Sequence, residues 1–464
     1  MTTRQKIDSS LHAQAIWQAG VEAVTPRSLM QFKIQRDGDW LIFDDAVEVD
    51  LSKLRRLIIV GAGKASAAMA VEFLNQHCQP SGTRMPAIET WINCPEGNFV
   101  SSYDGPVKLC AARPSGSNSP TQLAIDGTNK IIDLVASATE DDLVICMISG
   151  GGSALLVSPR PGISLSDKQA VAKHVAAAGG NIVQLNTVRS CLSRVKSGGL
   201  LRHCRTGRMI SLIISDVLGD PLNVIASGPT VLDQKIEFRD AIDALEQLRL
   251  TGQPELQNVL KWLRSQPTTD LVTESKAVCS NLILGNLADA VDAAGVKAVE
   301  LGYRYHMQVA RQPEGDVHQV ALQAHDQLVR IAQQPEIDCW ISGGEPTVRL
   351  PGENCGKGGR NQQLVLDVLD QMLANGWPKN YSGCEMTFLS GGTDGEDGPT
   401  DAAGAWLDNE LLQRVSQKGP KPSDYLARAD AYNFFDKTGG LLRTGPTGTN
   451  VCDLRVGIVV RSPS

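Results

Sequence analysis

The sequence contains no uninterrupted run of about 18 apolar residues, the length that a helix needs to cross a membrane. Its first residues, MTTRQKIDSSLHAQAIWQAGVEAV, lack the basic-then-apolar order and the cleavage site of a secretory signal peptide. We interpret them as an amphipathic helix with candidate core positions Leu11, Ile16, Val21 and Val24. The 11 cysteines include no C-x-x-C pair, so we expect free, mostly buried thiols and a reducing, cytoplasmic compartment.

An excess of positive charge is also absent, because 44 Lys and Arg stand against 51 Asp and Glu, a formal net charge of −7. Such a balance gives no general attraction to nucleic acid or to acidic lipid, so an anionic substrate would need a local cluster of donors. The 464 residues are enough for two or three domains.

Several familiar catalytic signatures are missing. Gly61-x-Gly63 is followed by Ser66 where the third glycine of a dinucleotide-binding turn would stand, and the spacing of a Walker A loop is absent. No G-x-S-x-G is present, which leaves a serine hydrolase poorly supported. The 7 histidines lie outside the glycine-rich turns, and no Cys/His set predicts a transition-metal site.

Short apolar runs that end in glycine-rich turns recur along the chain, and we expect strands within residues 54–63, 142–153, 208–220, 281–286, 338–345 and 386–395. Such runs are typical of strands buried on both faces, and their alternation with helical patterns favours βαβ units. The sequence therefore predicts two α/β domains, Rossmann-like and three-layered, with mostly parallel sheets and an interdomain cleft. We assign residues 1–240 and 241–464 to them, with the boundary somewhere within 230–275.

Glycines and small polar residues gather where these strands end. In open α/β sheets, ligands bind beyond the carboxyl ends of strands, where glycine lets the main chain present N–H donors to phosphate oxygens. We therefore interpret these turns as phosphate- or carboxylate-binding, with tight turns that serve only packing as the alternative. The candidate residues are Gly61, Gly63, Ser149, Gly150, Gly151, Gly152, Ser153, Gly343 and Gly344.

Basic residues accompany these turns. Lys64 follows a Gly-x-Gly turn at an expected helix N-terminus, where the helix dipole disfavours a cation unless an anion is bound. Arg189 and Lys196 stand seven residues apart, which would place them on one face of a single helix. Arg360 and Asn361 lie between glycines and the start of another expected helix. These side chains suit a carboxylate or phosphate clamp, and a solvated charge pattern is the alternative.

Carboxylates fall into the same turns, with Asp216, Glu345 and Asp394 as the candidates. Carboxylate oxygens suit Mg²⁺, which bridges a protein to substrate phosphates, and a carboxylate could instead act as general base for a hydroxyl group. Turn and helix-capping duty is the alternative, and it is equally supported for Asp220, Asp397 and Asp401.

Together these segments resemble the class II, MOFRL-type glycerate 2-kinases. The matching stretches run in the family's order from about residue 55 to 460: GAGKASAAMA, ISGGGSALL, PGISLSDKQAV, NTVRSCLSRVKSGGL, ISDVLGDPLNVIASGPT, ISGGEPTV, GKGGRNQQLVL, SGGTDGEDGPTDAAGA and TGPTGTNVCDLRV. The resemblance implies a two-domain α/β protein that uses ATP and Mg²⁺ to phosphorylate D-glycerate to 2-phosphoglycerate. It implies a hydroxy acid and a nucleotide as partners, no nucleic acid or membrane, and, if the chain assembles, a homodimer.

The resemblance also implies roles for single residues. Lys64 would approach the transferred phosphoryl group or the substrate, and Arg360 with Asn361 would stabilise negative charge. Substrate or phosphate would be held by Arg189, Lys196 and Asn450. Mg²⁺ would be held, or the attacking hydroxyl oriented, by Asp216, Glu345 and Asp394.

Three positions depart from the family's usual pattern, namely Arg113, Cys191 and Gln363. They leave the identity of the hydroxy acid open. A kinase of another small hydroxy acid is therefore one alternative, and a hydroxypyruvate reductase is a second.

Overall fold

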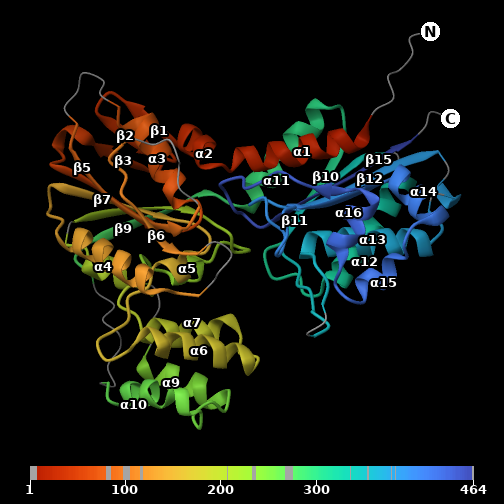
Figure 1. Ribbon diagram of the computed structural model, residues 1–464. Helices are drawn as coiled ribbons and strands as arrows, with labels where there is room; N and C mark the ends of the chain where they lie inside the picture. Colours follow the sequence, from red (N-terminus) through yellow and green to blue (C-terminus); the bar gives the residue numbers. More distant parts are fainter. Residues whose placement is uncertain are drawn as a thin grey trace. The chain divides into compact units, whose positions relative to one another are not determined.

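The computed structural model describes residues 8–79, 85–97, 105–114, 119–205, 207–232, 237–266, 275–334, 336–352, 355–377, 379–381 and 383–461, which fold into two compact units (Figure 1). Residues 26–284 form one, which we call the central unit for its place in the sequence. Residues 1–25 and 285–464 form the other, which we call the terminal unit. This division differs from the expected boundary within 230–275, and it also separates the first 25 residues from those that follow.

The central unit is built on a six-stranded sheet in the order β6-β5-β4-β7-β8-β9. Its pairings from β6 through β8 are parallel, as expected. Every residue of β7 is buried, which explains its unbroken apolar sequence. The strands are β4 (Arg56–Ala62), β5 (Ala87–Pro95), β6 (Leu109–Arg113), β7 (Asp142–Ile148), β8 (Arg208–Ile214) and β9 (Val278–Gly285).

Helices cover both faces of this sheet, with α3 (Ser66–His77) on one and α4 (Gln122–Ala136) on the other (Figure 1). Before the sheet come α2 (Pro26–Lys33) and an antiparallel meander of β1 (Ile34–Asp37), β2 (Trp40–Phe43) and β3 (Val47–Asp50), followed by η1 (Leu51–Lys53). Short helices α5 (Gly152–Leu155), α8 (Gly199–His203) and η2 (Ile225–Ser227) follow strands or turns of the central unit.

A separate helical group within the central unit has an apolar core of its own. It explains why the helical, polar stretch near residue 240 is not a domain boundary: α9 packs on α7 and α10 packs on α9, so the stretch joins helices that precede it in the chain. The group consists of α6 (Leu165–Ala177), α7 (Ile182–Cys191), α9 (Phe238–Gln247), η3 (Pro254–Leu256) and α10 (Gln257–Arg264).

The terminal unit has a mixed six-stranded sheet in the order β10-β11-β15-β12-β13-β14. Only β10 and β11 pair in parallel, so the expectation of mostly parallel sheets holds for the central unit and is wrong here. The reason is that β15, the last strand described, lies between β11 and β12 and runs antiparallel to both. The strands are β10 (Tyr305–Val309), β11 (Cys339–Gly344), β12 (Cys384–Gly392), β13 (Gly404–Asp408), β14 (Leu441–Leu442) and β15 (Asp453–Arg461).

Helices also cover both faces of this mixed sheet. α12 (Val317–Gln333) and α13 (Arg360–Ala374) share a large apolar core with one face, and α1 (Ser9–Ala23) with α11 (Leu287–Glu300) covers the other (Figure 1). The remaining helices are η4 (Lys379–Tyr381), α14 (Asn409–Lys418), α15 (Pro422–Leu426) and α16 (Ala431–Thr438).

The N-terminal helix α1 belongs to the terminal unit because its buried face packs on α11, β12 and β15. Three of its expected core residues, Ile16, Val21 and Val24, are at most 1% exposed. Leu11 is 60% exposed, so that prediction is wrong, and Trp17 fills the core instead. The Trp17 indole Nε1 donates to the Gly391 carbonyl of β12 at 3.2 Å.

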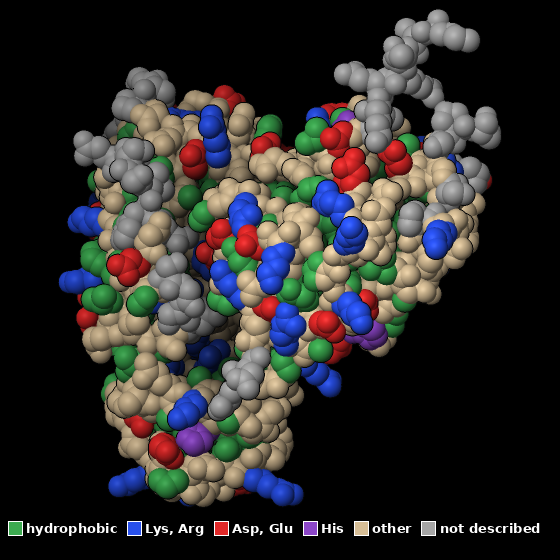
Figure 2. Space-filling model, turned by 45° about the vertical axis from the view of Figure 1, so that its right-hand side comes forward, with side chains coloured by type: hydrophobic (Ala, Val, Ile, Leu, Met, Phe, Trp, Pro, Cys, Tyr) green, Lys and Arg blue, Asp and Glu red, His purple; other side chains and the backbone are tan. Residues whose placement is uncertain are grey.

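All six expected strand segments form strands, and all 11 cysteines are free, 7 of them buried. In the described segments, β7 is followed directly by the short helix α5, and no long helix directly follows β8, because the chain turns sharply there. Gly151 has φ +76° and Asp220 has φ +54°, both in the left-handed region. No helix in the described ranges is long and apolar enough to cross a membrane. Acidic and basic side chains are interspersed on the face seen in Figure 2.

Candidate active site

The loops after β4 and β7 meet at the carboxyl edge of the central sheet, because the two strands are parallel neighbours. The Lys64 amide donates to the Gly150 carbonyl at 2.9 Å, and the Ala65 amide donates to Ser149 Oγ at 2.9 Å. Ser149 Oγ also lies 3.1 Å from Ser66 Oγ. The turns after these two strands therefore lie together, and Ser149 joins one loop to the other.

Close packing explains part of the glycine content of these loops. A Cβ on Gly63 would lie 2.0 Å from Ser149 Oγ, and one on Gly61 would lie 2.3 Å from the Met147 carbonyl oxygen. A Cβ on Gly152 would lie 3.0 Å from the Ala62 carbonyl oxygen. These three positions admit only glycine without a shift of the backbone, so packing alone accounts for them, and ligand binding by them stays a prediction.

Two cations border the β7 loop. Lys64 is half-buried and lies two residues before α3, and Arg113 ends β6 and is 3% exposed. A Cβ placed on Gly151 would be 2.9 Å from Arg113 Nη2 and 3.8 Å from Lys64 Cγ. Positive charge therefore collects beside the loop that the sequence assigns to an anion.

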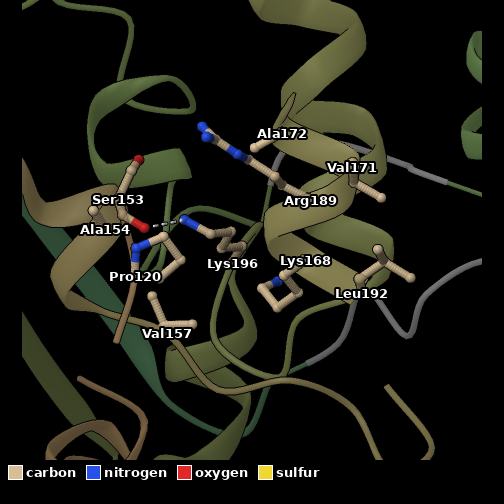
Figure 3. A pocket seen from close by; sticks show the side chains of 10 residues that line it. All are labelled: Pro120, Ser153, Ala154, Val157, Lys168, Val171, Ala172, Arg189, Leu192 and Lys196. Atoms are coloured by element: carbon tan, nitrogen blue, oxygen red, sulfur yellow. Dashed lines mark hydrogen bonds between the residues drawn. The ribbon is translucent and has the colours of Figure 1, made fainter. Parts of the chain in front are cut away.

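A pocket opens beside this loop, and Figure 3 shows the side chains that line it. Ser153 and Ala154 stand on one side, with α6 and α7 on the other, and Lys196 reaches across to the Ser153 carbonyl. The lining residues are Pro120, Ser153, Ala154, Val157, Lys168, Val171, Ala172, Arg189, Leu192 and Lys196. The pocket thus combines apolar walls with three cations, Lys168, Arg189 and Lys196.

Lys196 is held by two hydrogen bonds inside the pocket. It is 2% exposed, and its Nζ donates to the Ser153 carbonyl and to Ser227 Oγ, each at 3.1 Å. Burial first, and the charges of Lys168 and Arg189 next, hold the pKa of Lys196 well below its usual range. A neighbouring anion would relieve both effects.

Arg189 and Lys196 do not share a helix face, contrary to expectation. α7 ends at Cys191, before Lys196, so no single helix carries both side chains. Both side chains nevertheless line the pocket. Burial lowers the pKa of Arg189 as well.

Lys168 is a pocket residue that sequence reasoning missed. It is 7% exposed, and its Nζ has no hydrogen-bond partner among the described residues. Burial, with the charges of Arg189 and Arg160 adding to it, lowers the pKa of Lys168 to about 7. The signal was present in the sequence, since a lysine that shares a helix stripe with Val171 and Val175, both fully buried, is out of place in a simple amphipathic helix.

In the terminal unit, Arg360 begins α13 and is ion-paired on two sides. Its Nε and Nη2 donate to the two carboxylate oxygens of Asp453 at 2.6 and 3.0 Å, and its Nη1 lies 2.9 Å from Glu345 Oε1. Asp453 is fully buried at the start of β15, and sequence reasoning did not single it out. An acidic residue at the head of the apolar run DLRVGIVV was the available signal.

The segment after Arg360 is fixed by Asp397. This buried carboxylate accepts from the backbone amides of Asn361 at 3.0 Å and Gln362 at 2.8 Å, which caps α13. Burial raises the pKa of Asp397 to about 7. The Asn361 side chain is itself 1% exposed, and its Oδ1 accepts from Ser390 Oγ at 2.5 Å. The contacts of Asp397 thus show that it caps α13. A role of Asn361 in stabilising negative charge on a ligand stays a prediction.

The other predicted residues of the terminal unit serve packing and turns. A Cβ on Gly343 would lie 2.6 Å from Leu287 Cδ1, and one on Gly344 would lie 2.0 Å from Glu314 Oε2. Asn450 Oδ1 accepts from the Cys452 amide at 3.2 Å. Packing thus explains the two glycines of β11, and their contact with a ligand stays a prediction.

The three predicted metal ligands do not come from one unit. Asp216 follows β8 in the central unit, whereas Glu345 and Asp394 follow β11 and β12 in the terminal unit. Within the described ranges no group of three or more His, Cys, Asp or Glu side chains could hold a metal ion. A Mg²⁺ site would therefore draw on one or two carboxylates together with ligand oxygens.

Of the three departures from the family's usual pattern, only Arg113 lies beside the glycine loops. The Cys191 thiol is 3.4 Å from the Glu237 carbonyl oxygen, and burial raises its pKa to about 12. Gln363 donates to the Leu426 carbonyl at 3.2 Å. Neither of these two residues is among those that line the pocket.

Family models match most of the chain. One described as a domain of unknown function, DUF4147, matches residues 12–264, and one described as the MOFRL family matches residues 338–453. These two ranges fall mainly on the central and the terminal unit, respectively.

Curated relatives extend along nearly the whole chain. Glycerate kinase of Bos taurus is 34% identical and aligns over 95% of this chain and 91% of its own length. D-glycerate 2-kinase of Thermotoga maritima is 32% identical over 90% of this chain and 94% of its own. An Agrobacterium vitis protein provisionally named hydroxypyruvate reductase is 36% identical over 87% of this chain and 99% of its own length. The solved structure of Thermotoga maritima glycerate kinase matches with a TM-score of 0.76 and 28% identity, over 97% of this chain and 100% of that one.

Proposed function

The chain belongs to the MOFRL-type glycerate kinase family, and we propose that it transfers a phosphoryl group from ATP to the 2-hydroxyl of D-glycerate. The observation that carries this proposal is the similarity to a glycerate kinase over 95% of the chain. The structure supports it with a pocket that holds three cations and no acidic side chain, which suits an anionic substrate.

Phosphoryl transfer asks mainly for positioning and for compensation of negative charge. We assign contact with the transferred phosphoryl group to Lys64, because it borders Gly151 together with Arg113. Arg360 remains a candidate for charge compensation, with Asp453 and Glu345 fixing its guanidinium in place.

Mg²⁺ would be held by the carboxylates that follow β11 and β12. Glu345 is 41% exposed and Asp394 is half-buried, so each offers a hard oxygen ligand that water and phosphate can reach. Asp453 does not suit this role, because both of its oxygens receive hydrogen bonds from Arg360. When bound, the ion would neutralise phosphate charge on the nucleotide.

The reaction is tested by ³¹P NMR of the purified protein with MgATP and D-glycerate. The expected result is a new phosphomonoester signal that matches 2-phosphoglycerate. A 3-phosphoglycerate signal would retain the kinase and overturn the assigned hydroxyl. Intact ATP after incubation with D-glycerate would sink the proposed reaction.

Lys64→Met should reduce the rate of phosphate transfer at least 100-fold, because a cation beside the reacting phosphate stabilises charge that develops in the transition state. Lys53→Met is the matched control, since Lys53 lies in the same unit with a 77% exposed side chain. Equal rates for both variants would remove Lys64 from the mechanism.

The name of the Agrobacterium vitis relative raises a reductase as the second candidate. The missing third glycine speaks against it: Ser66 stands in that place and is fully buried against Ser149. Oxidation of NADH by hydroxypyruvate in the absence of ATP would revive it. A panel of hydroxy acids separates glycerate from related acceptors. The free cysteines support a reducing, cytoplasmic setting, and assembly as a homodimer stays a prediction.

A further inference from the structure

The pocket beside α6 and α7 carries an uncompensated positive charge. Its three ionisable lining residues, Lys168, Arg189 and Lys196, are all cations, and the neighbours that shift the pKa of Lys168 and Lys196 are cations as well. Buried charges of one sign repel one another and lose solvation, so a fold retains them at a cost in stability. The arrangement therefore suits a ligand that brings the missing negative charge.

The hydrogen-bonding state of these cations points the same way. Lys196 is occupied by Ser153 and Ser227, whereas the Lys168 ammonium has no hydrogen-bond partner in the described part of the chain. Arg189 forms no hydrogen bond or ion pair with a described residue either. Two donors that face one pocket are thus left for a ligand, and a carboxylate has two oxygens to accept from them.

We propose that Lys168 and Arg189 bind the carboxylate of the hydroxy-acid acceptor in this pocket, and that Lys168 takes up a proton as the carboxylate enters. The identity of the acceptor rests on the proposed function, but the assignment of its carboxylate to Lys168 and Arg189 does not. Lys196 helps to balance the charge, and its two hydrogen bonds fix the wall formed by Ser153.

Charge balance favours a carboxylate over the phosphates of the nucleotide. At neutral pH Arg189 is charged, and Lys168, with a pKa of about 7, is half-charged. These two residues together thus carry between one and two positive charges, which matches a single carboxylate. The walls of Val157, Val171 and Leu192 suit the short carbon chain of such an acid and not a triphosphate with its bound cation.

Proton uptake is expected because the charges that shift the pKa of Lys168, those of Arg189 and Arg160, are both positive. Arg189 faces it from α7, Lys196 from the turn after α7, and Arg160 from the segment before α6. The acidic side chains nearest along α6 are engaged elsewhere: Asp167 accepts from Ser164 and Asn258, and Glu255 of η3 lies 3.5 Å from His174. A carboxylate is therefore the first negative charge that Lys168 meets, and it raises the proton affinity of the amine.

Isothermal titration calorimetry of D-glycerate, in two buffers with different ionisation enthalpies, measures this uptake directly. We expect close to one proton taken up per glycerate at pH 8, where free Lys168 is mostly neutral, and almost none at pH 6, where it is already charged. Glycerol, which lacks the carboxylate, should bind at least 10-fold more weakly than D-glycerate and without proton uptake.

Lys168→Met should weaken D-glycerate binding at least 10-fold and reduce the uptake at pH 8, while the binding of MgATP stays within 2-fold. Lys173→Met is the matched control, because Lys173 lies on the same helix and is exposed. The Lys168→Met protein should melt at a higher temperature than the wild type, since an unpaired buried amine is removed, so weaker binding cannot be ascribed to unfolding.

Unchanged glycerate affinity in Lys168→Met would overturn the assignment, and so would loss of MgATP binding in its place, which would give the pocket to the nucleotide. Unchanged proton uptake in the variant would overturn the protonation step. If ³¹P NMR showed no phosphorylation of glycerate while carboxylate binding still depended on Lys168, the proposed function would fail and this inference would stand.

Discussion

Two cationic centres in this molecule are built in opposite ways. Arg360 in the terminal unit stands between the carboxylates of Asp453 and Glu345, and although burial acts to lower its pKa, these charges outweigh burial and raise it. Lys168 in the central unit meets only Arg189 and Arg160, and burial together with their charges lowers its pKa to about 7. A charge that the fold pairs is positioned by the fold, whereas a charge left without a counter-ion is available to a ligand.

The largest effect should come from breaking the paired centre. Arg360→Ala leaves the fully buried Asp453 without its partner, and removal of one member of a buried pair costs about 3–5 kcal/mol. Urea denaturation of both proteins, followed through the unfolding transition of the terminal unit, should show this loss as a lower free energy of unfolding. Arg443→Ala is the control, because Arg443 is 46% exposed in its pairs with Asp401 and Asp436, and it should cost less than about 1 kcal/mol. An equal loss of unfolding free energy in both variants would show that the fold tolerates a buried Asp453 without Arg360.

Removing the unpaired charge of Lys168 should have the opposite effect and raise the free energy of unfolding. The pKa of Lys168 is about 7 in the folded chain and about 10.4 when unfolded, so between these values the unfolded chain binds the additional proton. This residue therefore makes the protein more stable as pH rises from 7 to 9, by roughly 1 kcal/mol per pH unit, and its penalty is greatest below pH 7. Lys168→Met should be more stable than the wild type at pH 7 and should lose that slope.

Urea titrations at pH 7, 8 and 9 check this prediction, with Lys173→Met as the exposed control on the same helix. A slope of unchanged size in Lys168→Met would assign the titration to another group. A less stable Lys168→Met protein would show that the amine has a partner in the apo state, and the contrast with Arg360 would then disappear.

The glycine turns offer a smaller contrast. Gly63→Ala would place a methyl group 2.0 Å from Ser149 Oγ, between two loops that are hydrogen-bonded to each other, and such overpacking costs about 1–3 kcal/mol. Gly207→Ala is the control, since no atom lies within 4 Å of a Cβ built there and its φ is not positive. Thermal melting of both variants measures the difference. A harmless Gly63→Ala would mean that the β4 and β7 loops can move apart.

The same contrast shows what the sequence could predict. Buried strands were predictable because apolar runs between glycines have few other uses, and all six expected segments form strands. The mixed sheet of the terminal unit was not predictable, because no local sequence pattern indicates that β15 lies between β11 and β12. The end of α7 at Cys191 was missed for a similar reason, since the turn beyond it depends on left-handed backbone at Ser197 as well as at Gly198.

Candidate site residues can be proposed from the sequence where residue type and turn coincide, but not where burial decides. Lys64 and the glycines of the β4 and β7 loops were identified from their spacing, and the structure brings the two loops together. Lys168 and Asp453 were missed because each looks like an ordinary surface charge until tertiary packing buries it. What the sequence could not tell is which charges acquire a partner, and that is the property that separates the two centres.

The smallest expected effect concerns the hydroxyl that supports Lys196. Ser227 has left-handed backbone (φ +63°), and its Oγ lies 3.1 Å from Lys196 Nζ and 3.0 Å from Ser153 Oγ. Ser227→Ala keeps the Cβ and removes one of the two hydrogen bonds of a buried amine, which is worth about 1 kcal/mol. Because the Ser153 carbonyl still holds Lys196, we expect roughly a five-fold rise in the KM for D-glycerate with an unchanged KM for ATP. The control is Ser137→Ala, at an exposed position of the same unit, which should change neither KM. A rise in the KM for ATP alone in Ser227→Ala would show that Ser227 and Lys196 act in nucleotide binding.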